Sequence, residues 1–169
     1  DTFHSLLRQG GKVEKLNYYA TYDYKQSDGH RENSKYSANF GSLRLGYDFS
    51  DEWAFKVTGQ GFSDLANDPG PVNKPYTNND RRKYDRASFD VSIKKENSDE
   101  RFEIMAYNNI GEHKFSMPTI ADYWHSKDLT FGTRVEYLWT VYEDDRMHIK
   151  PDFGYEYQQQ LKSDKLKLV

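Results

Sequence analysis

Apolar and polar side chains alternate with a period of two along most of this chain. Between residues 15 and 25, the even positions carry Leu16, Tyr18, Ala20, Tyr22 and Tyr24. This period is typical of a β-strand with one apolar and one polar face. Six further segments repeat it: residues 42–49, 53–61, 86–94, 102–107, 129–141 and 147–158. Residues 3–8 resemble the end of one more strand, and no segment has a helical period. We therefore predict an all-β chain of seven to eight antiparallel strands.

Short and long connections alternate between these segments. Gly, Asn, Asp and Ser favour tight turns, and we expect such turns at residues 9–12, 50–52, 97–100 and 143–145. Longer connections, rich in Gly, Pro, Asn or charged residues, are expected at residues 27–37, 64–84 and 111–128. The sequence thus predicts a repeated unit of one hairpin and one long loop.

Composition excludes several classes of protein. Disordered chains contain few aromatic residues, so an aromatic content of 16% indicates an ordered chain. The net charge of −3, with the two signs interspersed, argues against a nucleic-acid-binding surface. The absence of cysteine excludes disulfide scaffolds and thiol catalysis. No apolar run approaches the ~18 residues of a membrane-spanning helix.

The sequence contains no recognisable catalytic or metal-binding pattern. It lacks the Gly-x-Ser-x-Gly and His-Glu-x-x-His motifs and a glycine-rich phosphate loop. Its five histidines have no ligand spacing, and the Asn- and Asp-rich residues 64–80 lack the spacing of a calcium-binding EF-hand loop. We therefore expect no enzymatic activity, no catalytic residues, no metal site and no cofactor.

The apolar side chains at alternate positions of each strand have two interpretations. They could form the core of a soluble β-sandwich or barrel, or they could face lipid while the alternate polar side chains line a lumen. Strand length, the contrast between short turns and long loops, and aromatic residues near strand ends favour lipid. We predict that residues 1–169 belong to one transmembrane β-barrel domain with short periplasmic turns and long extracellular loops. The charged residues expected to face the lumen are Arg44, Lys56, Arg134 and Glu136.

Four segments near the N-terminus carry a family resemblance. They are residues 3–19 (FHSLLRQGGKVEKLNYY), 24–34 (YKQSDGHRENS), 43–53 (LRLGYDFSDEW) and 64–72, which includes Asp68-Pro-Gly-Pro71. The first resembles the first barrel hairpin of TonB-dependent outer-membrane receptors. The second and third are similar to the loop pattern SDGYRxNS and the strand–turn–strand pattern LRLGYxxSDxW of that family, and the fourth to the loop that often follows. From residue 73 onward the likeness is one of architecture alone.

The resemblance implies a function and a set of partners. Receptors of this family have about 22 strands around an N-terminal plug. They import scarce nutrients such as ferric siderophores, haem or cobalamin across the Gram-negative outer membrane. The energy reaches the plug from the inner-membrane TonB complex. This sequence has no recognisable plug, TonB box or C-terminal aromatic residue. We therefore expect an internal barrel segment whose partners are the remaining strands and plug, membrane lipid and lipopolysaccharide, and a small nutrient.

Two expected outer loops combine cationic and aromatic side chains. The candidate ligand-binding residues are Tyr76, Arg81, Arg82, Tyr84, Tyr123, Trp124 and His125. Such side chains attract anionic ligands, for example a ferric siderophore or a phosphorylated sugar. They could equally bind lipopolysaccharide phosphates or remain solvated, and the sequence does not indicate the ligand. Two alternatives stay open: a small stand-alone outer-membrane barrel with an adhesive or structural role, and a soluble β-rich binding domain.

Overall fold

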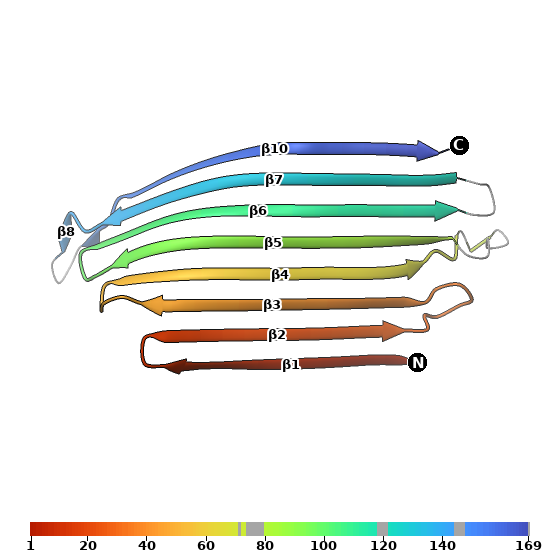
Figure 1. The fold of residues 1–169 in the computed structure, drawn as a ribbon, viewed down its shortest axis with the longest axis horizontal. Helices are drawn as coiled ribbons and strands as arrows, with labels where there is room; N and C mark the ends of the chain where they lie inside the picture. Colours follow the sequence, from red (N-terminus) through yellow and green to blue (C-terminus); the bar gives the residue numbers. More distant parts are fainter. Residues whose placement is uncertain (71, 74–79, 118–121, 144–147, 169) are drawn as a thin grey trace.

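The chain folds into a single antiparallel sheet (Figure 1). The computed structural model describes residues 1–70, 72–73, 80–117, 122–143 and 148–168. The eight strands of the sheet are β1 (Thr2–Val13), β2 (Leu16–Ser27), β3 (Tyr36–Asp48), β4 (Trp53–Asn67), β5 (Arg81–Glu96), β6 (Glu100–Met117), β7 (Asp122–Trp139) and β10 (Asp152–Leu168). A separate two-stranded sheet pairs β8 (Tyr142–Glu143) with β9 (His148–Ile149). The all-β prediction is confirmed, with eight antiparallel strands in the main sheet.

Each strand of the main sheet pairs with its neighbours in the chain. The spatial order is β1-β2-β3-β4-β5-β6-β7-β10, so β1 and β10 form the two opposite edges (Figure 1). Within the described ranges, no other strand pairs with the free edge of β1 or β10, and the sheet is open. No helix among these residues is long and apolar enough to cross a membrane.

The sheet is one layer thick, so few side chains are removed from solvent. Among the described residues, the buried apolar side chains are Ala38 and Ala66, and the buried polar ones are Ser92 and Glu103. All twelve residues of β1 are exposed. The pairing of strands, rather than a core between two layers, holds this structure together.

The first predicted turn is wrong, because residues 9–12 lie inside β1 and the chain reverses at Glu14 and Lys15 instead. Glu14 has a φ of 53°, in the left-handed region that tight turns use. Gly10 and Gly11 serve a different purpose. A Cβ at Gly10 would come within 2.8 Å of Tyr19 Cδ2, so the missing side chain makes room for an aromatic ring on β2.

Two other predicted connections also differ. Residues 111–128 were expected to form a long loop, but β6 continues to Met117 and β7 begins at Asp122. The apolar–polar alternation fades there because both faces become polar, while the backbone pairing continues. The last strand begins at Asp152 rather than residue 147, directly after Pro151, which has no N–H to donate to a strand ladder.

Candidate functional site

The register of the sheet gathers alternate residues into rows that cross all eight strands. One such row is Val13, Leu16, Tyr47, Phe55, Ile93, Ile104, Val135 and Tyr155. Because successive side chains of a strand point to opposite faces, this row and every second row beside it share one face. We call it the apolar face and the opposite one the polar face.

On β1 to β7, four consecutive rows of the apolar face carry no charged residue, whereas on β10 Lys162 lies in the fourth of these rows, opposite Leu129. They run from the row of Phe55 to the row of Gly61, and we call them the apolar band. Its exposed large apolar side chains are Leu7, Val13, Leu16, Tyr22, Leu43, Leu45, Tyr47, Phe89, Ile93, Ile104, Ile110, Phe131, Tyr155 and Tyr157. The band is thus a largely apolar exposed surface that extends from β1 to β10.

On β5 and β6, charged residues limit the apolar band at both ends. We call the end of the sheet at residues 14–15, 49–52 and 97–99 the turn end, and the opposite end the loop end. On β5, Lys95 at the turn end and Asp85 at the loop end are the first charged residues beyond the band. On β6 the corresponding residues are Glu100 and Glu112. The band therefore has nearly the same height on these two strands.

The limit at the turn end combines ion pairing with aromatic rings. Lys95 donates to Glu100, and Tyr137 Oη donates to Glu100 Oε2 at 3.0 Å. The ring of Tyr137 stacks on that of Trp139, with centroids 5.2 Å apart. Trp53 and Phe102 lie in the same row as Tyr137. Aromatic rings with polar tips thus mark this boundary.

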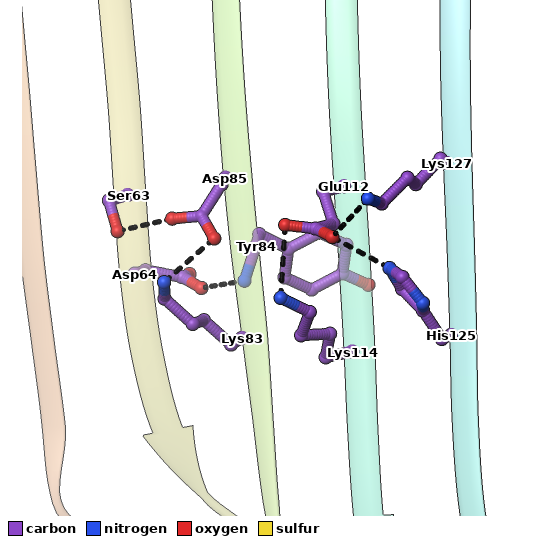
Figure 2. A network of polar contacts seen from close by, with 9 residues as sticks. All are labelled: Ser63, Asp64, Lys83, Tyr84, Asp85, Glu112, Lys114, His125 and Lys127. Carbon is purple, nitrogen blue, oxygen red and sulfur yellow. Dashed lines mark hydrogen bonds and ion pairs between the residues drawn. The ribbon is translucent and has the colours of Figure 1, made fainter.

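The limit at the loop end is a network that we call the charged rim (Figure 2). It consists of Lys83, Asp85, Glu112, Lys114, His125 and Lys127 on the apolar face of β5, β6 and β7. Asp85 accepts from Lys83 at 2.8 Å and from Ser63 of β4 at 2.6 Å. The next row toward the turn end contains Ala87, Ile110 and Leu129, so the rim borders the apolar band directly.

Glu112 is the centre of the charged rim. Its carboxylate lies 2.7 Å from His125 Nε2, 3.1 Å from Lys114 Nζ and 3.3 Å from Lys127 Nζ. Hydrogen bonds from Lys114, His125 and Lys127 outweigh desolvation and lower the pKa of Glu112 to about 2. Glu112 is therefore ionised at neutral pH and accepts from three neighbouring side chains.

The polar face carries charges at the height where the apolar face has none. Lys56 and Arg134 share one row, and Arg44 lies in the next. Glu103, only 8% exposed, lies 3.5 Å from Lys56 Nζ and 3.3 Å from Arg101. Arg134 pairs with Glu136 at 3.2 Å. The four residues predicted to face a lumen, Arg44, Lys56, Arg134 and Glu136, thus lie on one face.

An aromatic ladder occupies the polar face at the loop end. The ring of Tyr84 stacks on His113 at 3.8 Å, and His113 meets Trp124 edge-on at 4.6 Å. Burial and the nearby positive charge of Arg82 lower the pKa of His113, so its imidazole is neutral at pH 7. Tyr84 N–H donates to Asp64 Oδ1 at 3.1 Å. Toward the turn end, Phe40, Phe62 and Asn109 line a hollow of about 310 Å³.

Strand alternation divides the predicted ligand-binding residues between the two faces. Arg82, Tyr84 and Trp124 lie on the polar face, whereas Arg81, Tyr123 and His125 lie on the apolar face. All six belong to strands β5 and β7 rather than to loops. Tyr76 lies outside the described residues. The structure therefore brings together two groups of three, and not one site.

Among the residues of these clusters that sequence reasoning missed are Glu112, His113, Lys114 and Lys127. They fall in the segment that was expected to be a loop, where no register could be assigned. The sequence of residues 112–115 does alternate charged side chains with rings. Only the pairing of β6 with β7, however, places His125 and Lys127 beside Glu112.

Comparisons with known proteins add no family. A scan against protein-family models finds no match to the chain, and a search of curated proteins finds none either. Among the described residues, no three His, Asp or Glu side chains come together as a metal site would require. The geometry of the two faces is therefore the basis for the functional argument.

Proposed function

We propose that this chain is a barrel segment of a TonB-dependent receptor in the Gram-negative outer membrane, which imports a scarce nutrient. The observation that carries the proposal is the apolar band, which is uncharged on β1 to β7 and is limited by charged residues at both ends on β5 and β6. The apolar band by itself supports a membrane barrel. The resemblance of residues 3–72 to TonB-dependent receptors is the reason to propose a receptor of that family. The nutrient belongs to the ferric siderophore, haem or cobalamin class.

The height of the apolar band supports a lipid environment. Lys95 and Asp85 are ten positions apart on β5, or about 33 Å along a strand that rises ~3.3 Å per residue. A strand tilted by ~40° would span about 25 Å of membrane, the height of the apolar belt of outer-membrane barrels. A soluble sheet would need a second layer to cover the same surface. The rings of Trp53, Tyr137 and Trp139 fit an interfacial girdle.

The free edges of the sheet support the proposal that the chain is a segment of a larger barrel. β1 and β10 expose backbone groups along 12 and 17 residues, and unpaired strand edges do not occur in lipid. Under this proposal both edges pair with further strands of the same receptor. The polar face then surrounds the plug, which connects to the TonB complex, and the chain has no enzymatic role.

The polar face supplies the nutrient-facing groups of the proposal. Arg82, Tyr84 and Trp124, beside the 310 Å³ hollow, combine one cation with stacked rings at the loop end. Such a surface suits an anionic ligand with flat or apolar parts. Arg81, Tyr123 and His125, on the other face, would meet the outer lipid surface and not the nutrient.

Cysteine labelling tests the lipid assignment, because the chain has no natural cysteine. We would place single cysteines at Val57, Val91 and Val135 on the apolar face, and at Gln60, Ser88 and Thr130 on the polar face, of the full-length protein in outer membranes. The first set should react with a lipid-soluble maleimide and resist a water-soluble one; the second set should show the reverse preference. Apolar-face cysteines that resist both reagents until unfolding would indicate a soluble core and refute the proposal.

The apparent mass of the natural protein separates a segment from a complete small barrel. Extraction from outer membranes should yield a heat-modifiable species far larger than the 20.0 kDa of this chain. A heat-modifiable species of about that mass would favour the eight-stranded stand-alone barrel instead.

A further inference from the structure

Two of the four segments that carry the family resemblance meet at the loop end of the sheet (Figure 1). We call residues 28–35, which connect β2 to β3, the β2–β3 loop, and residues 68–70, which follow β4, the Pro-Gly turn. Two side chains of the loop donate to backbone carbonyl oxygens of the turn: Arg31 Nη2 to Gly70 at 2.6 Å and Asn33 Nδ2 to Asp68 at 2.8 Å. We call this pair of contacts the loop latch.

The β2–β3 loop is folded on itself, which orients both donors of the latch. Gly29 has a φ of 78°, in the left-handed region, and a Cβ at this position would collide with Ser34. Ser34 Oγ accepts from the Arg31 N–H at 3.2 Å and donates to the carbonyl oxygen of Arg31. Asn33 also has a positive φ, of 55°. The direction in which Arg31 and Asn33 point is therefore a property of the loop itself.

The Pro-Gly turn has a backbone shape that its own residues define. The ring of Pro69 restricts the backbone of the turn. Gly70 has a φ of 65°, and its N–H donates to Asp68 Oδ1 at 2.9 Å. The Asp68 N–H donates to the carbonyl oxygen of Asp80 at 2.8 Å, which ties the turn to the residue before β5. Because the acceptors of the latch are backbone atoms, the latch depends on the shape of this turn and not on its side chains.

The closed latch leaves one donor unsatisfied. Arg31 and Asn33, together with Asp68 and Gly70, are half-buried. Arg31 Nε is buried and has no hydrogen-bond partner in the described part of the chain. A buried donor without a partner is unfavourable, and opening of the latch would return it to water. The unsatisfied Nε thus reduces the free-energy difference between a closed and an open latch.

We propose that the loop latch makes the β2–β3 loop and the Pro-Gly turn one conformational unit, which opens and closes in a single step. Loss of Arg31 on one side, or of the backbone shape at Gly70 on the other, frees both parts together. This inference goes beyond the proposed function and does not depend on the lipid assignment. Under the proposed function, the latch lies at the outer mouth of the receptor, so its opening changes the shape of the entrance.

Hydrogen exchange of the purified full-length protein, followed by mass spectrometry, tests this proposal. Arg31→Met removes the guanidinium and should accelerate exchange of the Asp68 and Gly70 amides at least about fivefold, because a hydrogen bond from a charged donor is lost. Gly70→Ala meets no atom within 4 Å but strains a positive φ. It should accelerate exchange of the Gly29 and Arg31 amides by a similar factor. A single unit requires this reciprocal response.

Matched controls separate the latch from general effects of charge or of an added methyl group. Lys35→Met removes an exposed cation from the same loop, and Gly59→Ala adds a methyl group at an open glycine. Both should leave exchange in the loop and the turn within about twofold, and the amides of Val91 and Ile104 report that each variant is folded.

Three results would overturn the proposal. The first is that each variant accelerates exchange only on its own side of the latch, and the second is that neither Arg31→Met nor Gly70→Ala changes exchange. The third is that Lys35→Met acts as strongly as Arg31→Met. None of these results bears on the lipid assignment, which cysteine labelling tests separately.

Discussion

Tyr107 of β6 donates its hydroxyl hydrogen to Glu156 of β10, although β7 lies between these two strands. The contact is possible because Gly132 of β7 lies directly beneath the tyrosine ring, where any Cβ would collide with it. A single glycine thus lets a side chain bridge three strands of the polar face. It also ties β10 to the rest of the sheet by more than its backbone ladder.

Replacing Gly132 should therefore weaken the sheet near β10. Gly132→Val displaces the Tyr107 ring and breaks its bond to Glu156, which should lower the free energy of unfolding by about 1–3 kcal/mol. Gly154→Val is the control, because nothing lies within 4 Å of its Cβ. Equilibrium unfolding in denaturant would measure both variants. Equal effects would show that the glycine at 132 is not needed for the bridge.

The ion pair between Lys56 and Glu103 should contribute more than an exposed pair. Lys56 reaches Glu103 across β5, and the side chain of Glu103 is 11% exposed. Lys56→Met leaves this carboxylate with Arg101 as its remaining ion-pair partner and should cost about 1–2 kcal/mol, since Lys56 itself is partly screened by solvent. Lys12→Met removes the more exposed pair with Asp48 and should cost ~0–1 kcal/mol. Denaturant midpoints would give the comparison, and a larger loss at Lys12 would contradict it.

A charge placed in the apolar band should block membrane insertion. Val91 lies in the second row of the apolar band, and Thr130 lies on the polar face within the height of the band, three positions nearer the loop end. Under the proposed function, Val91→Arg costs about 2–4 kcal/mol because the arginine enters hydrocarbon, while Thr130→Arg faces the lumen and is tolerated. The amount of folded protein in outer membranes measures the difference. If both variants accumulate equally, the apolar face does not contact lipid.

Acid should weaken the charged rim in a defined pH range. The folded-state pKa of Glu112 is about 2, below its ordinary value of 4.5. The stabilisation is therefore complete above pH 4.5 and is lost as the pH falls from 4.5 toward 2, because the carboxylate becomes protonated and loses its charged interactions with Lys114 and Lys127. Thermal midpoints of the wild type should fall across this range, and those of Glu112→Gln should fall less. Parallel curves for the two proteins would contradict the assignment.

The sequence predicted the strands where one face is apolar. The alternation of Leu43, Leu45 and Tyr47, or of Val91 and Ile93, corresponds to the apolar face of β3 and β5. It failed where both faces are polar, as at Glu112 and Lys114, since hydrophobic periodicity cannot identify a strand without an apolar side. It also misassigned Gly10 and Gly11 as a turn, because a glycine that accommodates a cross-strand ring looks the same in sequence as one that reverses the chain.

The sequence by itself determined the all-β class. Within each strand that it predicted, it also determined which side chains share a face, because both properties depend on local periodicity. Which residues become neighbours depends on the register between strands, a long-range property that pairing decides. Only the folded sheet shows that residues 122–128, expected to form a loop, belong to a strand, and it thereby places Tyr123 and His125 on the other face from Trp124. The same pairing brings Glu112 to Lys127 and aligns the uncharged residues of neighbouring strands into one band. Local pattern thus determines the two faces, and tertiary pairing determines the sites on them.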